Sequence, residues 1–238
     1  MQLRNTMLTK IIYTCATLMI LLSAPLTFGA EVADKSISIP APEGYIEVTS
    51  EMNLAWSLVQ AWQGANRIIA FYIPSSERKA ALTNKQVNFD RNINIQVNLK
   101  AEGFTFTQTD FDLLKKSVRD MLATTQANEI QEKALVQYSG DLSKVAGYDL
   151  NMKQTANLSL PMHLDSTNQF SYSEVSSAEV NAPDGKRITD QSTTTSTAIL
   201  VKGKVLYCYV TGAAGDLNWS RETAKKWVES ILNANTEN

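Results

Sequence analysis

The segment 92–99 alternates strictly between apolar and polar residues, and this pattern constrains the fold more than any other feature of the chain. Ile93, Ile95, Val97 and Leu99 alternate with Asn94, Gln96 and Asn98. Successive side chains of a strand point to opposite faces, so a period of two separates the apolar set from the polar set. The sequence therefore predicts a half-buried strand with one face on the core and one wet face.

Three further patterns predict strands. Residues 67–73 are apolar on both faces and stop at Pro74, which is typical of an interior strand. Segments 196–201 and 205–210 flank Lys202-Gly203-Lys204 and should pair as an antiparallel hairpin. A second hairpin is expected around residues 182–185, between Ser/Thr-rich strands near 170–180 and 188–197.

Helices are expected at three places. Thr109 and Asp112 have the spacing of a capping box, followed by apolar residues at helical spacing over about 110–124. The C-terminal segment repeats the same period, with Asn218 or Ser220 as its N-cap and Trp227 on its apolar face. Residues 53–63 form a weaker candidate. The segment 130–139 fits either a helix or a strand.

Strands and helices come in blocks, which favours an α+β fold with a mainly antiparallel sheet and helices packed on it. The order of parts resembles the Mog1/PsbP-like α/β/α sandwich over residues 36–234, and in particular the exported bacterial DcrB-like proteins. The segments that carry the resemblance are Ile39-Pro40-x-Pro42-Glu43-Gly44-Tyr45, Asn92-Ile93-Asn94-Ile95, Ala146-Gly147-Tyr148, Gly203-Lys204-Val205-Leu206-Tyr207, and Trp227 with Ile231-Leu232.

The resemblance implies a mostly non-catalytic accessory or envelope protein, and it carries over no catalytic residues. This chain departs from the family pattern in a Ser/Thr-rich insertion near residues 155–195. The register of the middle strands is therefore left open.

The first thirty residues have the pattern of a secretory signal peptide. Arg4 and Lys10 precede an apolar run over 11–22, and residues 24–30 are small and free of acids. The run is shorter than the roughly 20 residues that span a bilayer, so we expect cleavage and export to the periplasm, with an uncleaved anchor as the alternative. Residues 31–238 then form a single domain, without a stable membrane span after cleavage.

The charge balance excludes two classes of partner. The chain has 22 Lys and Arg against 24 Asp and Glu, and loss of Arg4 and Lys10 leaves a net charge of −4. Nucleic acids and anionic membrane surfaces are bound by clustered positive charge, which this chain lacks.

Cys208 and His163 would be the residues of interest in an enzyme. Cys208 alternates with Leu206 and Val210 and should be a buried, inert thiol. His163 is the single histidine, which excludes a multi-histidine metal site, and Asp165 two residues later is not placed to orient its imidazole. We expect a surface histidine, no metal and no cofactor.

One motif supports an enzymatic alternative. Ser76-x-x-Lys79 matches the S-x-x-K element of penicillin-recognising serine enzymes, and Ser139-Gly140-Asp141 lies downstream where a second serine motif would be. The third element is absent, because only Lys202-Gly203-Lys204 resembles K-T-G. A serine hydrolase or penicillin-recognising enzyme using Ser76 and Lys79 is therefore the alternative function.

Tryptophans mark the possible recognition surface. Trp56 and Trp62 lie near one end of the chain and Trp219 near the other, and the fold could bring them together. Tryptophan is enriched in binding hot spots. The predicted function is an exported non-catalytic binding or accessory protein of the cell envelope, with an unknown protein or small molecule as its ligand and no catalytic residues.

Processing of the leader is the first testable prediction. Thr27 and Gly29 occupy the −3 and −1 positions of one cleavage site, and Ala30 is the last residue removed at the other. Mass spectrometry of the native protein should find an N-terminus at Ala30 or Glu31. An intact Met1 in the membrane fraction would contradict cleavage.

Overall fold

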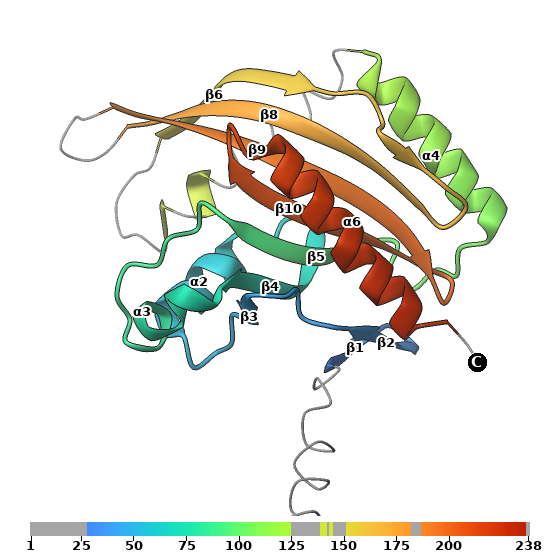
Figure 1. The fold of residues 1–238 in the computed structure, drawn as a ribbon, viewed down its shortest axis with the longest axis horizontal. Coiled ribbons are helices and arrows are strands. Elements are labelled where there is room, and N and C mark those ends of the chain that lie inside the picture. The colour runs from blue at the N-terminus through green and yellow to red at the C-terminus, as the bar shows by residue number, and fades with distance from the viewer. Residues whose placement is uncertain (1–27, 125–138, 142, 145–150, 182–186, 237–238) are drawn as a thin grey trace, which may run out of the picture.

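The computed structural model describes residues 28–124, 139–141, 143–144, 151–181 and 187–236. Within these residues, eight strands form an antiparallel sheet in the order β3-β4-β5-β10-β9-β8-β6, and β7 pairs with β8 (Figure 1). The strands are β3 (Tyr45–Glu47), β4 (Asn66–Pro74), β5 (Asn92–Asn98), β6 (Asn151–Ser159), β7 (Leu164–Asp165), β8 (Gln169–Asn181), β9 (Arg187–Val201) and β10 (Lys204–Ala213).

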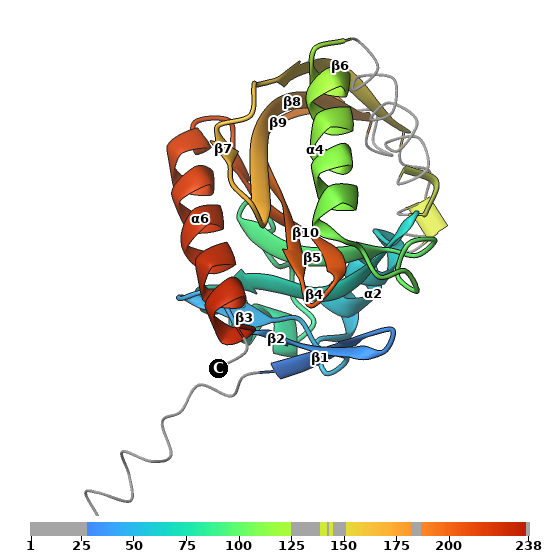
Figure 2. The same ribbon diagram turned by 90° about the vertical axis from the view of Figure 1, so that its right-hand side faces the viewer.

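Helices cover both faces of this sheet. The long C-terminal helix α6 (Leu217–Ala234) lies on one face, and α2 (Asn53–Ala61) and α4 (Gln108–Leu122) lie on the other (Figure 2). A short turn η1 (Ser75–Glu77) and helix α3 (Arg78–Leu82) follow β4. The α+β class and the antiparallel sheet with packed helices are confirmed. No helix in the described part of the chain is long and apolar enough to cross a membrane.

The largest core layer lies under α6. Trp227 is only 3% exposed, packs edge-to-face on Tyr72 with 5.7 Å between ring centres, and donates its indole N–H to the Pro40 carbonyl at 2.8 Å. Cys208 is fully buried in the same layer, as the alternation predicts. Burial raises the pKa of its thiol.

A separate hairpin of β1 (Phe28–Val32) and β2 (Lys35–Ile39) closes one end of this layer. The Lys204 ammonium, 1% exposed, fastens the hairpin to the sheet because it contacts Asp34 at 2.9 Å and the carbonyls of Glu102 and Phe104 at 3.1 Å. A buried ammonium is tolerated only when its donors are satisfied, and these three acceptors satisfy it.

The predicted wet face of β5 is wrong for its first half. Asn92 and Asn94 are each 7% exposed, because their amides form internal hydrogen bonds to Phe89 and Gln96. Leu99 lies beyond the strand and is 52% exposed.

Both predicted helix starts are also wrong. Thr107, not Thr109, caps α4, and a capping box forms with Asp110. Asp216 stands before α6 without capping it, because its carboxylate accepts from Arg91 and from the Ala213 N–H. The predicted cap Ser220 lies inside α6, where its hydroxyl bonds to the Leu217 carbonyl and to Thr195.

The Ser/Thr-rich segment near 155–195 supplies β6, β7, β8 and much of β9, so it builds nearly half of the sheet. Hydroxyl pairs tie β8 to β9 on both faces, with Ser171 to Thr197 at 2.7 Å and Ser173 to Thr195 at 3.0 Å among them. The two predicted hairpins are both present as strand pairs. Residues 182–186, most of 130–139, and Ala146-Gly147-Tyr148 lie outside the described residues.

Thiol labelling tests the burial of Cys208. A maleimide should fail to react in native protein and react fully in denaturant, since the side chain is 0% exposed. Cys208→Ser should lower the free energy of unfolding by about 1–3 kcal/mol, because a buried hydroxyl would lack a partner. Rapid labelling of the folded protein would contradict the burial.

Truncation of Trp227 tests the docking of α6. Trp227→Ala should lower the free energy of unfolding by roughly 3–5 kcal/mol, since it opens a cavity beside Tyr72. Trp219→Ala is the matched control at a half-buried ring on the same helix and should cost clearly less. Urea unfolding of the two variants measures the difference, and equal losses would mean that α6 is not docked as described.

Candidate functional site

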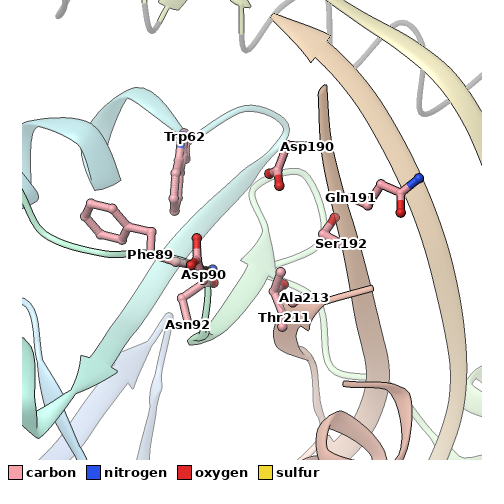
Figure 3. A pocket seen from close by; sticks show the side chains of 10 residues that line it. Trp62, Phe89, Asp90, Asn92, Asp190, Gln191, Ser192, Thr211 and Ala213 are labelled. Carbon is pink, nitrogen blue, oxygen red and sulfur yellow. Dashed lines mark hydrogen bonds between the residues drawn. The ribbon is translucent and has the colours of Figure 1, made fainter. Parts of the chain in front are cut away.

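A pocket of about 340 Å³ lies where the α2 side of the sheet meets the outer end of the long β9 strand. Figure 3 shows Trp62 and Phe89 on one side, Asp190, Gln191 and Ser192 on the other, and Asp90 and Asn92 between them. The end of β10, from Thr211 to Ala213, completes the lining. Segments far apart in the sequence therefore meet at this site.

The aromatic wall is held by the core under α2. Trp62 is the C-cap residue of α2, so its position is fixed by the end of that helix. Its ring contacts Phe71 at 5.2 Å and Phe89 at 5.6 Å between centres, and Phe71 and Phe89 are 6.1 Å apart. Because Phe71 is buried in β4, this three-ring cluster gives the pocket a rigid apolar side.

The opposite wall follows from a difference in strand length. The last residue of β10, Ala213, pairs with Ser192, while β9 begins five residues earlier at Arg187. Asp190 and Gln191 therefore lie on the part of β9 that pairs with β8 alone. Figure 1 shows the β8–β9 pair extending beyond the end of β10.

The base of the pocket carries a directed acceptor. The Asn92 amide nitrogen donates to the Phe89 carbonyl at 2.9 Å, which fixes the orientation of the amide. Its oxygen Oδ1 has no hydrogen-bond donor among the described residues. The Asn92 side chain is only 7% exposed, and its Oδ1 remains as a hydrogen-bond acceptor at the pocket.

The pocket is acidic. Asp90 and Asp190 are exposed, and in the described part of the chain neither forms an ion pair. Asp90 accepts one hydrogen bond, from the Asn88 amide at 3.0 Å. None of the described residues that line the pocket is Lys, Arg or His. The two carboxylates therefore keep their charge available for a ligand.

Arg91 does not neutralise them, although it follows Asp90 directly. Its guanidinium makes two hydrogen bonds of 2.9 Å to the Asp216 carboxylate and lies 4.5 Å from the centre of the Trp219 ring. The same pairing lowers the pKa of Asp216 and raises the pKa of Arg91. Asp90 and Arg91, which both precede β5, therefore have different partners.

The predicted aromatic surface is divided by the sheet. Trp62 lines the pocket, whereas Trp219 packs on the core layer under α6, on the opposite face. Trp56 lies on α2, 37% exposed, and does not line the pocket. Phe89, Asp90 and Asp190 were not singled out by sequence, since nothing in their local pattern shows that the sheet register brings them together.

Ser76 and Lys79 are exposed side chains on η1 and α3. No hydrogen bond joins them within the residues that are described, and neither lines the pocket. Ser139 accepts a hydrogen bond from the Met152 N–H, and Asp141 pairs with Lys144. Ser139 and Asp141 therefore have partners other than Ser76 and Lys79.

His163 and Asp165 are engaged separately. Asp165 pairs with Lys115 at 2.8 Å and with Arg119 of α4, and Lys115 foremost lowers its pKa. His163 is exposed, and partial desolvation together with the nearby Arg221 of α6 lowers its pKa. The described residues contain no group of three His, Cys, Asp or Glu placed to hold a metal ion.

Comparison with known proteins finds likeness among solved structures. The fold is similar to the solution structure of cyanobacterial PsbP (CyanoP) from Synechocystis sp. PCC 6803, with 12% sequence identity, a TM-score of 0.33, and coverage of 82% of this chain and 84% of that chain. No family model and no curated protein matches the sequence. The α+β class rests on the strand order and the helix placement described above.

Proposed function

We propose that the chain is an exported, non-catalytic binding protein of the cell envelope that holds a small ligand in the pocket between Trp62 and Asp190. The observation that carries the proposal is a rigid aromatic wall facing polar groups that have spare hydrogen-bonding capacity. Ligand pockets commonly combine apolar walls with a few directed polar groups, and a volume of about 340 Å³ lies in their usual range.

The hydrogen bonds of the two hydroxyl side chains in the pocket favour binding over catalysis. The Ser192 and Thr211 side chains lie 3.0 Å and 3.1 Å from the hydroxyls of Ser176 and Thr194. Nucleophilic catalysis requires a base beside the nucleophile, and the described lining includes no histidine or lysine. The only bases in the described lining are carboxylates, and both hydroxyls already bond to neighbouring hydroxyls, so the pocket is better suited to recognise a ligand than to activate a nucleophile.

Location in the envelope, most consistent with the periplasm, rests on the leader pattern of residues 1–30. The resemblance of the sequence to the DcrB-like proteins supports the same assignment. An accessory role toward a larger envelope partner would use the ligand site or the exposed β8–β9 pair, since projecting segments are common contact surfaces.

A ligand screen by thermal unfolding tests the proposal. The protein is heated with a library of small cationic, neutral and anionic compounds, and at least one class should raise the midpoint of unfolding in proportion to ligand concentration. Trp62→Leu should abolish the shift, because it removes the aromatic wall while keeping an apolar side chain on the α2 core.

Trp56→Leu is the matched control. It removes an exposed indole from the same helix outside the pocket, so the ligand-induced shift should persist. A screen without any stabilising compound, or shifts that survive Trp62→Leu unchanged, would refute the pocket as a ligand site.

A further inference from the structure

We infer that the pocket binds an organic cation, with an ammonium head group on a small apolar body. This inference rests on the proposed function and names the ligand class of the same site. It is carried by three independent features: the aromatic corner, two carboxylates that form no ion pair within the described residues, and the Asn92 amide oxygen, which accepts no hydrogen bond from the described residues.

The aromatic corner suits a cation with a hydrocarbon shell. Trp62 and Phe89 meet at an interplanar angle of 68°, so their rings form two non-parallel walls. A cation over an aromatic face is attracted by the ring quadrupole, with Trp the strongest of the aromatic side chains, and aromatic corners of this kind hold quaternary ammonium groups. The rings also shield the apolar body of such a ligand from water.

The carboxylates set the sign of the ligand charge. Asp90 lies beside the Phe89 ring and Asp190 stands across the pocket from Trp62 (Figure 3). A second hollow, which shares Phe89 and Asp90 with the pocket, adds Glu77, whose carboxylate accepts from the Asn88 N–H at 3.1 Å. These carboxylates would repel an anionic ligand, and the described lining of either hollow has no basic group to pair with it.

The Asn92 amide supplies the polar contact at the base. Its Oδ1 can accept a hydrogen bond from an N–H or O–H of the ligand, while its amide nitrogen remains on the Phe89 carbonyl. Asn92 is 93% buried, so this acceptor is oriented before a ligand arrives. Two negative charges and one neutral acceptor at one cavity favour a cation that carries at least one N–H or O–H donor.

Four compounds that share a trimethyl-branched end separate charge from shape, and in choline that branched end itself carries the charge. Choline carries a quaternary ammonium, 3,3-dimethylbutylamine a primary ammonium, 3,3-dimethyl-1-butanol is the neutral carbon analogue of choline, and 3,3-dimethylbutanoate is the anion. Calorimetric titration at low ionic strength should show at least one cation binding about tenfold more tightly than the alcohol, and no binding of the anion. Raising the salt concentration should reduce the preference for the cation over the alcohol, because salt screens the exposed carboxylates.

Charge-neutralising variants locate the effect. Asp190→Asn and Asp90→Asn should each weaken cation binding about three- to fivefold, and the double variant should lose most of the preference for the cation over the alcohol. Asp120→Asn is the control, since Asp120 is an exposed carboxylate on α4 outside both hollows. Unfolding curves of all variants confirm that they fold.

The outcomes distinguish this inference from the proposed function. Tight binding of the alcohol or the anion, sensitive to Trp62→Leu, would overturn the cation assignment and leave the pocket as a ligand site. Failure of both cations to bind at millimolar concentrations, or an Asp120→Asn effect equal to that of the pocket variants, would also overturn it. Whether the pocket binds any ligand at all is tested separately, by the broader thermal screen.

Discussion

Strand β10 is the element on which the rest of the structure depends, because it pairs with two neighbours that belong to different halves of the sheet. On one side it joins β5, and through β5 the strands β4 and β3; on the other it joins β9, β8 and β6. Its own side chains alternate between the core under α6, which holds Leu206, Cys208 and Val210, and the face shared by α2 and α4. Without this strand the molecule would be two small sheets, each with an unpaired edge.

The two faces of the sheet differ in a way that explains the position of the pocket. The face under α6 has one large apolar core and, beside it, buried hydroxyl pairs such as Thr195 with Ser220, whereas the other face has two separate apolar cores, one under α2 and one under α4. Between those cores, the register aligns polar side chains across three strands, as in the row of Asn92, Thr211 and Thr194. A polar strip of this kind cannot be covered by an apolar helix at low cost, since buried polar groups need partners. The pocket lies at the end of this strip, where α2 ends and where β9 extends beyond its pairing with β10.

The sequence predicted the elements much better than it predicted the site. The alternation of 92–99, the apolar segment 67–73 and the helical spacing around Trp227 each depend on local pattern, and all three elements are present. The cap positions were wrong because several Ser, Thr and Asp residues near each helix start can serve as caps, and tertiary contacts such as Arg91 to Asp216 decide between them. The wet face of β5 was wrong because burial of Asn92 and Asn94 depends on amide partners that alternation does not reveal.

The candidate site was harder to predict from the sequence than these elements, because its two acidic residues are a hundred positions apart. Asp90 precedes a strand and Asp190 lies within a Ser/Thr-rich run, and only the antiparallel order β5-β10-β9 brings them to one pocket. Trp62 could be singled out as an aromatic residue with a binding propensity, but its separation from Trp219 by the sheet could not be read from the sequence. Long-range register, rather than local composition, determines the chemistry of this site.

The pairing of Arg91 with Asp216 leaves the pocket acidic, and this determines which ligands it can select. The only arginine next to the pocket in sequence is held on the far side by two hydrogen bonds to Asp216 and by the Trp219 ring, so the pocket side of this strand end is left with uncompensated negative charge. Exposed carboxylates alone attract a cation weakly, since water and salt screen them. A bare divalent ion would also lack ligands, because calcium takes six to eight oxygens and Asp90 and Asp190 are the only carboxylates in the described lining of the pocket. A cation gains affinity here only if it also covers the Trp62 and Phe89 rings, and that requirement selects an organic ammonium over a metal ion.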